Sequence, residues 1–287
     1  MFCILTQNPR DWSNLQLQRA LRKKKIEYGC LRITDFFSRI GDCPKVRIGE
    51  ESLDDFECIL VRGIPGGSLE QIIFRMDVLH RLENLGVGVI NSAESIEKTV
   101  DKYYTLSLLE DEGIKVPKTI CTESREEAME AFLELKEVVV KPLFGAQGAG
   151  IVRIFEEDTA YNVFRALELG NFVYYIQEFI PHKNEDFRVF VLNGEVVSSI
   201  KRISDSWKTN VSRGAKVKRV ELSEELENLC LRASEILGCF YCGVDVLESD
   251  GIYYFIELNS IPAWRGLQKV TGFNLAERIV DEVLEIS

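Results

Sequence analysis

The sequence predicts an α/β N-terminal unit with a parallel sheet, followed by two α+β units, the last of which contains an antiparallel sheet. Short apolar runs alternate with helical periodicity over residues 1–93, which is typical of parallel strands joined by crossover helices. Further along, Asn193-Gly194 separates two strand-like segments, and this dipeptide favours a two-residue hairpin between antiparallel strands. We therefore divide the chain into units at residues 1–93, 94–180 and 181–287.

The length and composition are those of an ordinary globular protein. A chain of 287 residues can bury a substantial core, and its 46% hydrophobic and 28% charged residues exclude a disordered or fibrous protein. The net charge of −11, from 35 basic and 46 acidic residues, argues against a nucleic-acid surface or an anionic membrane as the main partner. We expect neither partner, although a local basic pocket is compatible with this charge.

The sequence is that expected of a cytoplasmic protein. The N-terminal apolar run is short and lacks a basic segment before it, and no stretch approaches the roughly 20 apolar residues that span a bilayer. The eight cysteines are scattered, which favours reduced thiols. Cys239 and Cys242 have C-x-x-C spacing but no second pair at zinc-like spacing. We expect both in one strand, with their sulfurs on opposite faces.

Three strands and one clear helix are expected in residues 1–93. The strands are residues 2–5, 58–63 and 87–91. Between the last two, apolar residues recur at helical spacing, at Leu69, Ile72, Ile73, Met76, Leu79, Leu82 and Leu85. The loop 64–68 closes a strand, which is the usual place for ligand contacts in an open α/β sheet.

Residues 94–180 are expected to form a small α+β unit of ordinary module size. One helix begins near Ser95, includes Lys102 and ends at Gly113. After an extended link, the expected elements are, in order, a helix at 124–136, a strand and glycine-rich loop at 138–150, a strand at 151–155, a helix at 158–169 and a strand at 172–180.

Residues 181–287 are expected to begin with a hairpin and to continue as a mixture of helices and antiparallel strands. The expected elements are, in order, strands at 187–192 and 195–201, a polar loop at 208–216, a helix at 223–237, strands at 241–248 and 252–259, and a closing helix at 274–285.

The stretch VVVKPLFGAQGAG, residues 138–150, joins a buried strand to a glycine-rich loop. Glycine permits positive φ and close approach to a ligand, so such a junction can wrap a phosphate chain, and Lys141 could add a charge for the same anion. The alternative is a hairpin whose lysine only reaches solvent. The order of lysine and glycines matches neither of the two well-known phosphate-binding fingerprints.

Three oxygen-bearing side chains fall at the ends of two neighbouring strands. Glu257 and Asn259 are two residues apart and share a strand face, and Asp245 on the preceding strand can reach the same point. Two carboxylates and an amide oxygen suit Mg²⁺ that also holds phosphates. The alternative is that the carboxylates accept hydrogen bonds or pair with Lys or Arg, and the residues alone leave both readings open.

Several separated motifs occur together in one order: Lys102, Lys141 with the glycine loop, QEFI (177–180), DFR (186–188), KTNVSRG (208–214), GVD (243–245) and ELN (257–259). This set resembles the ATP-grasp fold, and specifically the RimK-like carboxylate–amine ligases, over about residues 60–287. The first 60 residues match only in their α/β pattern. The resemblance implies an N-terminal pre-ATP-grasp domain, a small central lid subdomain and a C-terminal subdomain that carries the metal site.

The resemblance implies ATP as co-substrate and assigns it a set of contacts. The phosphates would meet Lys102, Lys141 and the closing loop that contains Gly145, Gln147 and Gly148. The adenine would meet the backbone at Glu178 and Phe179, and the ribose would meet Asp186. A further nucleotide-contacting triplet would be Lys208, Thr209 and Asn210.

The resemblance also implies Mg²⁺ or Mn²⁺, with two ions expected, on Asp245, Glu257 and Asn259. Three arginines would clamp the transferring phosphate and the amino-acid carboxylate, since guanidinium binds such oxyanions bidentately: Arg188, Arg202 and Arg213.

The implied reaction is ATP-dependent formation of an amide. A substrate carboxylate attacks the γ-phosphate to give an acylphosphate, and an amine then displaces phosphate. Catalysis would be mainly positioning and charge neutralisation, with water excluded by the lid.

The expected substrates are L-glutamate and a small-molecule carboxylate acceptor. The segments NVSRGAK and NSIPAWRGLQKVTG are more similar to family members that extend coenzyme tails. Tetrahydromethanopterin is therefore expected first, then the deazaflavin coenzyme, then an amino-acid carrier protein or a protein C-terminus. A nucleotide-binding module without turnover is the alternative from another class, and family members are often dimers or tetramers.

Four further side chains have less specific expectations. His80 and His182 lack a cysteine or second histidine at metal spacing, so surface or packing roles are favoured. Trp207 and Trp264 flank polar loops and could stack on a planar substrate ring, although ordinary packing is favoured for Trp264.

Overall fold

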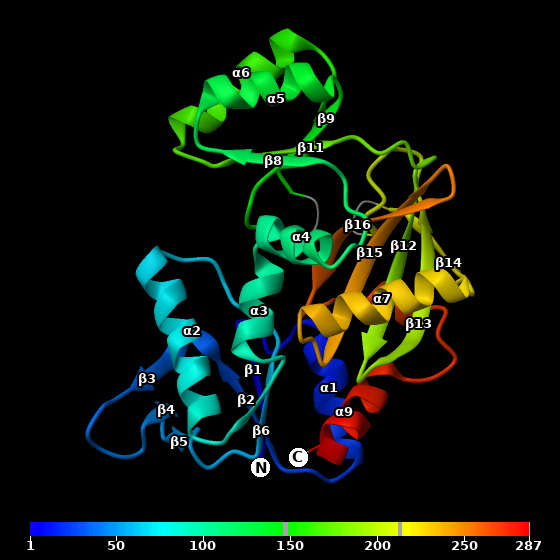
Figure 1. Cartoon of the computed structure of the whole chain (residues 1–287). Helices are drawn as coiled ribbons and strands as arrows, with labels where there is room; N and C mark the ends of the chain where they lie inside the picture. Colours follow the sequence, from blue (N-terminus) through cyan, green and yellow to red (C-terminus); the bar gives the residue numbers. More distant parts are fainter. Residues whose placement is uncertain (146–148, 212–213, 287) are drawn as a thin grey trace.

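The computed structural model describes residues 1–145, 149–211 and 214–286, and its larger sheets are an N-terminal, a central and a C-terminal one (Figure 1). The N-terminal sheet is parallel, with strand order β2-β1-β6-β7. Its strands are β1 (Phe2–Thr6), β2 (Tyr28–Arg32), β6 (Cys58–Val61) and β7 (Gly88–Ile90), and its crossover helices are α1 (Trp12–Lys23) and α2 (Leu69–Asn84). The three predicted strands and the α/β class are thus confirmed.

Residues 28–52 contain structure that the sequence did not predict. Strand β2 joins the parallel sheet, and a short 3-10 helix, η1 (Ile33–Asp35), follows it. A separate antiparallel sheet comes next, with β3 (Phe36–Ser38), β4 (Val46–Ile48) and β5 (Glu51–Ser52). The strands of this sheet have only two or three residues each, which is too short to give a clear period of two.

Helix α2 is placed as predicted, but its apolar residues do not form one buried stripe. Ser68 caps the helix through a capping box with Gln71. In the later turns Met76, Leu79 and Leu82 are buried. In the first two turns Leu69, Ile72 and Ile73 are exposed.

The single helix expected from Ser95 to Gly113 is wrong, because the chain breaks at Asp101. Helix α3 (Ala93–Val100) ends there and α4 (Lys102–Asp111) begins. Asp101 has an extended backbone, and its carboxylate accepts hydrogen bonds from the N–H groups of Tyr103 and Tyr104. A short carboxylate at this position caps a new helix, so Lys102 becomes the first residue of α4.

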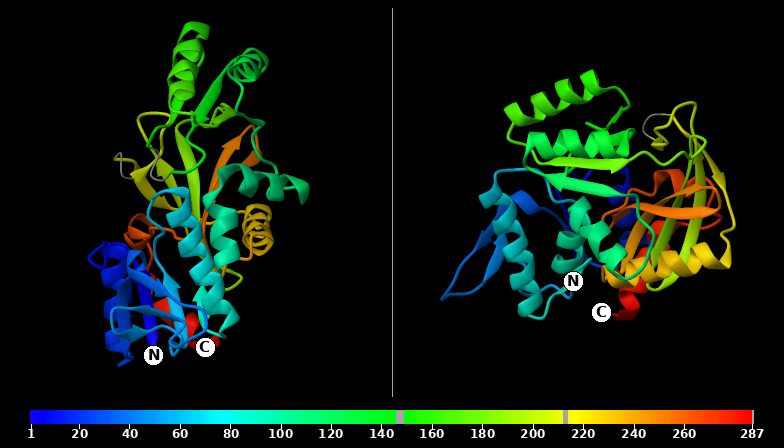
Figure 2. Two further views of the ribbon diagram at one scale, coloured as in Figure 1. Left: turned by 90° about the vertical axis from the view of Figure 1, so that its left-hand side faces the viewer. Right: turned by 45° about the horizontal axis from the view of Figure 1, so that its top comes forward.

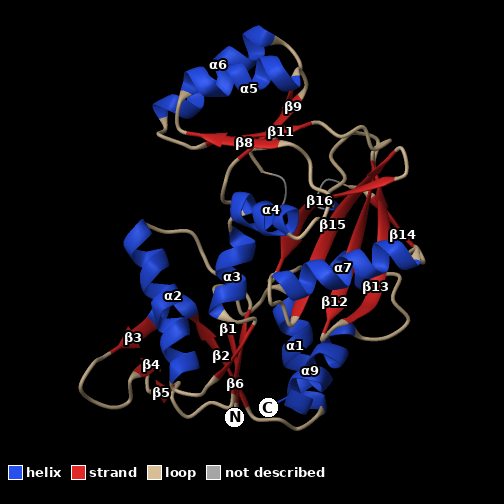
Figure 3. Ribbon diagram, in the orientation of Figure 1, coloured by secondary structure: helices blue, strands red, loops and turns tan. Residues whose placement is uncertain are grey.

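The central sheet is antiparallel, with order β10-β9-β11-β8. Its strands are β8 (Thr119–Thr122), β9 (Val138–Lys141), β10 (Val152–Ile154) and β11 (Tyr174–Glu178). Helices α5 (Arg125–Leu135) and α6 (Glu157–Leu169) cover one face through a buried cluster that includes Phe132 and Phe164. The other face is turned toward the C-terminal sheet (Figure 3).

The C-terminal sheet is antiparallel, with order β14-β13-β12-β15-β16. Its strands are β12 (Glu185–Leu192), β13 (Glu195–Ile203), β14 (Lys216–Arg219), β15 (Tyr241–Ser249) and β16 (Ile252–Asn259). The hairpin predicted at Asn193-Gly194 is confirmed, and both residues have the positive φ, 48° and 76°, that its two-residue turn needs. Helix α7 (Glu224–Ile236) covers one face.

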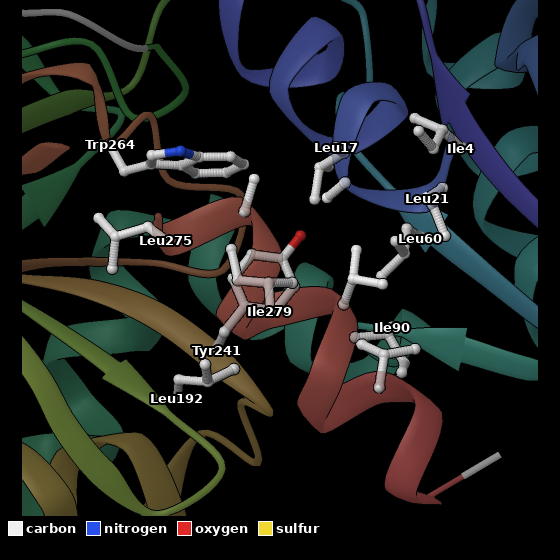
Figure 4. Packing of buried hydrophobic residues seen from close by; sticks show 14 of the residues in the cluster. Ile4, Leu17, Leu21, Leu60, Ile90, Leu192, Tyr241, Trp264, Leu275 and Ile279 are labelled. Atoms are coloured by element: carbon white, nitrogen blue, oxygen red, sulfur yellow. The ribbon is translucent and has the colours of Figure 1, made fainter. Parts of the chain in front are cut away.

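The opposite face of the C-terminal sheet shares a core with the N-terminal unit (Figure 4). Ile4, Leu17 and Leu60 from the first unit meet Trp264 and Ile279 in this cluster. Ile279 belongs to α9 (Leu275–Ile286), which packs along α1, and α8 (Arg265–Gln268) precedes it. Trp264 is fully buried here, so ordinary packing is confirmed for it. In Figure 2 the two termini lie close together, at the end away from the central sheet.

The expectation for the C-x-x-C pair is wrong. Cys239 precedes β15 instead of lying in it, and Gly238 turns the chain there with φ of 66°. Cys239 and Cys242 are both buried in the apolar cluster under α7, so their sulfurs do not lie on opposite faces of the sheet. No described helix has the length and apolar character required to cross a bilayer.

Replacing Ile279 with Ala should lower the free energy of unfolding by about 2–5 kcal/mol, because Ile279 is buried in the shared core. Urea unfolding followed by circular dichroism measures this change. Leu169→Ala, at an exposed position on α6, is the control and should cost less than about 0.5 kcal/mol. An equal cost for the two variants would contradict the assignment of the core.

Candidate functional site

A cavity lies between the central and C-terminal sheets, and most of the predicted site residues line it. Those that line it are Lys102, Lys141, Glu178, Phe179, Asp186, Arg202, Lys208, Thr209, Asn210, Asp245 and Glu257. Arg188 and Gly145 do not line it but bond to the lining residues Asp245 and Lys102. Asn259 does not line it either, and pairs with Gly243, two residues before Asp245 on β15. Gln147, Gly148 and Arg213 lie outside the described residues.

Two lysines lie near the start of the glycine loop, Lys102 in contact with it and Lys141 at the end of the strand before it. Lys102 Nζ donates to the carbonyl oxygen of Gly145 at 2.9 Å and to that of Leu143 at 3.3 Å. Lys141 Nζ donates to Gln177 Oε1 at 2.6 Å. The loop turns back at Gly150, where φ is 74°, a conformation that favours glycine. The helix start, the loop and the strand end therefore bring two ammonium groups to one wall of the cavity.

Burial weakens the charge of both lysines. It lowers the pKa of Lys102 and lowers the pKa of Lys141 to about 8, although the Glu257 carboxylate acts in the opposite direction. An anion placed between these groups would restore the full charge. This wall of the cavity is therefore electrostatically suited to phosphate.

The end of β11 supplies an aromatic and apolar wall. Phe179 lies edge-on to Trp207 with ring centres 6.2 Å apart, and the Arg153 guanidinium lies 3.6 Å from the centre of the Phe179 ring. Glu178 Oε1 accepts a hydrogen bond from the Lys118 N–H at 2.8 Å, so this carboxylate is tied to the link before β8. His182 packs beside Phe179 and is buried, as its favoured packing role predicts.

Sequence reasoning missed the apolar residues that complete this wall, which are Pro117, Val139, Ile151, Ile180, Leu247 and Ile256. It also missed Gln177, which holds Lys141 and donates to Thr119 Oγ1 at 2.9 Å. An apolar residue in a strand gives the same sequence pattern whether its side chain faces a core or a cavity. The sequence alone therefore does not distinguish cavity-lining residues from core residues. The six apolar residues, with Phe179 and Trp207, line one part of the cavity, which we call the apolar slot. Its apolar lining suits a flat aromatic ring.

Four buried charged side chains form a continuous network on the cavity face of the C-terminal sheet. Arg202 donates bidentately to Asp186, at 2.7 and 2.5 Å, and its Nη2 lies 3.0 Å from Asp245 Oδ2. Arg188 Nη1 donates to Asp245 Oδ1 at 2.7 Å, and Thr209 Oγ1 donates to Asp186 Oδ2 at 2.6 Å. Strand register produces this arrangement, since Asp186 pairs with Arg202 and Arg188 with Asp245.

The two carboxylates of the network differ in the direction of their pKa shifts. Burial raises the pKa of Asp186 to about 6, despite the opposing charge of Arg202. Burial would also raise the pKa of Asp245, but Arg188 and Arg202 together outweigh it and lower that pKa. The surroundings of Asp245 therefore favour its ionised form, which a metal ligand needs.

Gly243 provides the space for Arg188. A Cβ atom built on Gly243 would lie 2.4 Å from Arg188 Cζ and 2.8 Å from its Nε, closer than any real contact. Gly243 lies two residues before Asp245 on β15, so the guanidinium crosses the strand at this glycine to reach the carboxylate. The glycine of the GVD motif is thus a steric requirement of the charge network.

A β-bulge places Glu257 on the cavity face. Asp245 pairs with Glu257, but the next pair is Val246 with Phe255, so Ile256 is the extra residue. As a result Phe255 and Leu258, three residues apart, both lie in the core under α7. Without the bulge, Glu257 would share the core face with Phe255.

The donor set fits a divalent metal such as Mg²⁺. Asp245, Glu257 and Asn259 occupy one face, and their carboxylate and amide oxygens are hard donors. Asn259 Oδ1 accepts a hydrogen bond from the Ile261 N–H at 2.8 Å, which fixes the amide. Within the described ranges, no group of three or more His, Cys, Asp or Glu side chains could hold a metal, so the amide is needed to complete the set.

Comparison with known proteins gives one consistent result. The protein-family model of the RimK PreATP-grasp domain matches residues 1–96, and that of the RimK-like ATP-grasp domain matches residues 99–283. The tetrahydromethanopterin:alpha-L-glutamate ligase of Methanocaldococcus jannaschii is 35% identical over 283 residues, covering 96% of each chain. The alpha-aminoadipate–LysW ligase LysX of Sulfurisphaera tokodaii is 37% identical over 210 residues, covering 71% of this chain and 74% of that protein.

Solved structures show the same fold. The RimK domain ATP-grasp protein from Sphaerobacter thermophilus aligns over 98% of each chain with a TM-score of 0.78 and 20% sequence identity. The predicted ATP-grasp fold is therefore confirmed.

Affinity for ADP, the nucleotide that the resemblance predicts, should fall roughly three- to tenfold between pH 7 and 9.5, because Lys141 loses its charge as pH rises through about 8. Isothermal titration calorimetry measures this change.

In the absence of ligand, the unfolded chain binds more protons than the folded chain between about pH 8 and 10.5, because the pKa of Lys141 is lower in the folded chain. Lys141 therefore destabilises the fold fully below that range and progressively less as pH rises through it.

Lys141→Arg is the control for this prediction, because arginine keeps its charge over the whole range. Its affinity for ADP should change much less with pH than that of the wild-type protein, because Lys102 is then the remaining lysine on this wall. A wild-type affinity that is equally flat would contradict the role of Lys141.

Proposed function

Because the chain belongs to the RimK-like ATP-grasp family, we propose that it is an ADP-forming ligase that adds L-glutamate to a carboxylate of tetrahydromethanopterin. The observation that carries the proposal is the cavity that is lined by two lysines, an apolar slot and the carboxylates of Asp245 and Glu257, with Asn259 two residues beyond Glu257 on β16. The match to ligases with this name along nearly the whole chain supports the choice of acceptor.

ATP would bind with its adenine in the apolar slot and its phosphates toward the lysines. Phe179 and Trp207 border the slot, and Lys102 and Lys141 line the same cavity, where they would face the phosphates. Magnesium, held by Asp245, Glu257 and Asn259, would neutralise phosphate oxygens, and we expect two ions there. Arg188 and Arg202 keep Asp245 ionised and in place.

The reaction would proceed in two displacements. The acceptor carboxylate attacks the γ-phosphorus of ATP, the bond to the β,γ-bridging oxygen breaks, and ADP leaves. The amine of glutamate then attacks the acyl carbon, phosphate leaves with the bonding electrons, and the nitrogen loses a proton to give the amide. The residues of the site act by positioning and by charge, without a covalent enzyme intermediate.

Two contacts at the cavity support the exclusion of water from this site. Lys208 Nζ donates to the Ile151 carbonyl oxygen at 2.6 Å, which joins the loop after β13 to the segment before β10. Within the central unit, Lys102 joins α4 to the start of the glycine loop. Both contacts would help to protect the acylphosphate from hydrolysis.

The carrier-protein ligase is the second candidate, because LysX-type relatives match about seven-tenths of the chain. The acceptor recognised by such a ligase would be a protein carboxylate instead of a coenzyme.

All eight cysteines are free thiols in the structure, which supports the cytoplasm as the compartment for either reaction.

The direct test incubates the purified protein with ATP, Mg²⁺ and L-glutamate, with tetrahydromethanopterin or the deazaflavin coenzyme added separately. We expect the mass of tetrahydromethanopterin to rise by one glutamate residue, with one ADP formed per amide. If only the deazaflavin coenzyme gained mass, that coenzyme would be the acceptor instead of tetrahydromethanopterin. ADP binding without mass gain on either would contradict the coenzyme assignment and favour a protein acceptor.

Glu257→Gln should reduce amide formation at least 100-fold while the fold is retained, because the variant lacks a charged metal ligand. Glu248→Gln is the matched control, since Glu248 is an exposed carboxylate on the same hairpin. It should keep wild-type activity. Unchanged ligation by Glu257→Gln would contradict the metal assignment.

A further inference from the structure

The N-terminal sheet contacts the C-terminal sheet at the open end of the β15–β16 hairpin. Gly243 and Asn259 form the last residue pair of this hairpin ladder, so residues 240–241 and 260 lie just beyond it. Asn91 follows directly after β7 and is completely buried at this position. Asn91 lies outside the motifs and the expected ligand contacts described above.

The Asn91 amide uses its full hydrogen-bonding capacity on the hairpin backbone. Its Nδ2 donates to the carbonyl oxygen of Tyr241 at 2.8 Å and to that of Ser260 at 2.5 Å. Its Oδ1 accepts from the N–H groups of Phe240 at 2.6 Å and Tyr241 at 3.2 Å. One side chain therefore makes two donor and two acceptor bonds, which is all that a primary amide offers.

Neighbouring side chains support the same junction. Thr99 Oγ1 lies 2.6 Å from Ser260 Oγ, and Ser95 Oγ donates to the Gly238 carbonyl oxygen at 2.5 Å. Arg62, after β6, donates to Tyr241 Oη at 3.1 Å and to the Pro262 carbonyl oxygen at 2.8 Å. Each bond joins residues 62–99 to the two segments that flank the hairpin ladder.

These bonds act where the ladder itself no longer holds the two strands. Ser260 directly follows Asn259, and Tyr241 precedes Asp245 by four residues on β15. The amide of Asn91 therefore ties the residue after Asn259 to the start of β15, just beyond the last pair of the ladder. Because the amide is buried, no water can replace a lost donor without a change in the surrounding structure.

We propose that Asn91 is a positioning residue of the metal site. It acts through Tyr241 and Ser260 to hold Asn259 in place relative to Asp245 and Glu257. This inference rests on the proposed function, because it assumes that these three residues bind magnesium.

The test compares ADP binding with and without Mg²⁺ in Asn91→Asp, measured by calorimetry. The variant keeps the size of the side chain and its acceptor oxygen but loses both donors, to Tyr241 and Ser260. We expect affinity for ADP in the presence of Mg²⁺ to fall at least tenfold, and metal-free affinity to change less than twofold. Hydrogen exchange should rise in residues 257–262.

A second variant and a matched control separate positioning from general instability. Thr99→Val removes the bond to Ser260 Oγ, together with two bonds from Thr99 Oγ1 to the Ser95 and Ile96 carbonyl oxygens within α3, and should lower the magnesium-dependent affinity about threefold. Asn14→Asp is the control: Asn14 is also buried, and its Nδ2 donates to Thr6 Oγ1 and the Asn8 carbonyl oxygen within the N-terminal unit. In Asn14→Asp, Mg²⁺ should change the affinity for ADP by the same factor as in the wild-type protein.

The outcomes distinguish this inference from the proposed function. The positioning role would be overturned if Mg²⁺ changed the ADP affinity of Asn91→Asp as much as it changes that of the wild-type protein. It would also be overturned if the variant lost as much ADP affinity without Mg²⁺ as with it. In both cases the metal site stands. If Asn91→Asp does not fold, Thr99→Val decides by the same criterion. A wild-type protein whose ADP affinity does not respond to Mg²⁺ would overturn the metal site and this inference with it.

Discussion

The site depends on two arginines buried side by side with two carboxylates on the C-terminal sheet. Arg188 and Arg202 share Asp245, and Arg202 also holds Asp186. Removing one partner would leave an uncompensated charge in the interior, which is far more costly than the loss of an exposed ion pair. The network therefore limits which side chains are tolerated around it, including the glycine at 243. It also keeps a carboxylate ionised at a depth where burial alone would favour its neutral form.

Much of the fold was predictable because local signals and global structure agree. Asn193-Gly194 has one favoured hairpin geometry, and the apolar runs at β1 and β6 leave little choice but a buried parallel sheet. The break at Asp101 was less visible, because the residues on both sides favour a helix. Only the capping preference of the aspartate marked the boundary.

The site was predictable in its polar residues and hidden in its supporting structure. Lysines, carboxylates and glycines are rare enough in strand ends to attract attention, whereas Val139 and Leu247 could equally belong to a core. The bulge at Ile256 has no sequence mark, since a one-residue insertion in a strand changes the facing of side chains without changing composition. The bonds of Asn91 depend on a partner about 150 residues away, which no local pattern can reveal.

The core shared by α1, Trp264 and α9 has a consequence for how such chains can be recombined. The first 93 residues bury Leu17 and Leu60 against Ile279, so their apolar surface is covered only when the C-terminal helix is present. A chimera that exchanges this unit with that of a relative would have to exchange α9 and the loop around Trp264 as well. The central unit differs, because α5 and α6 close its own cluster around Phe164. It is the part of the chain that could be exchanged as a cassette.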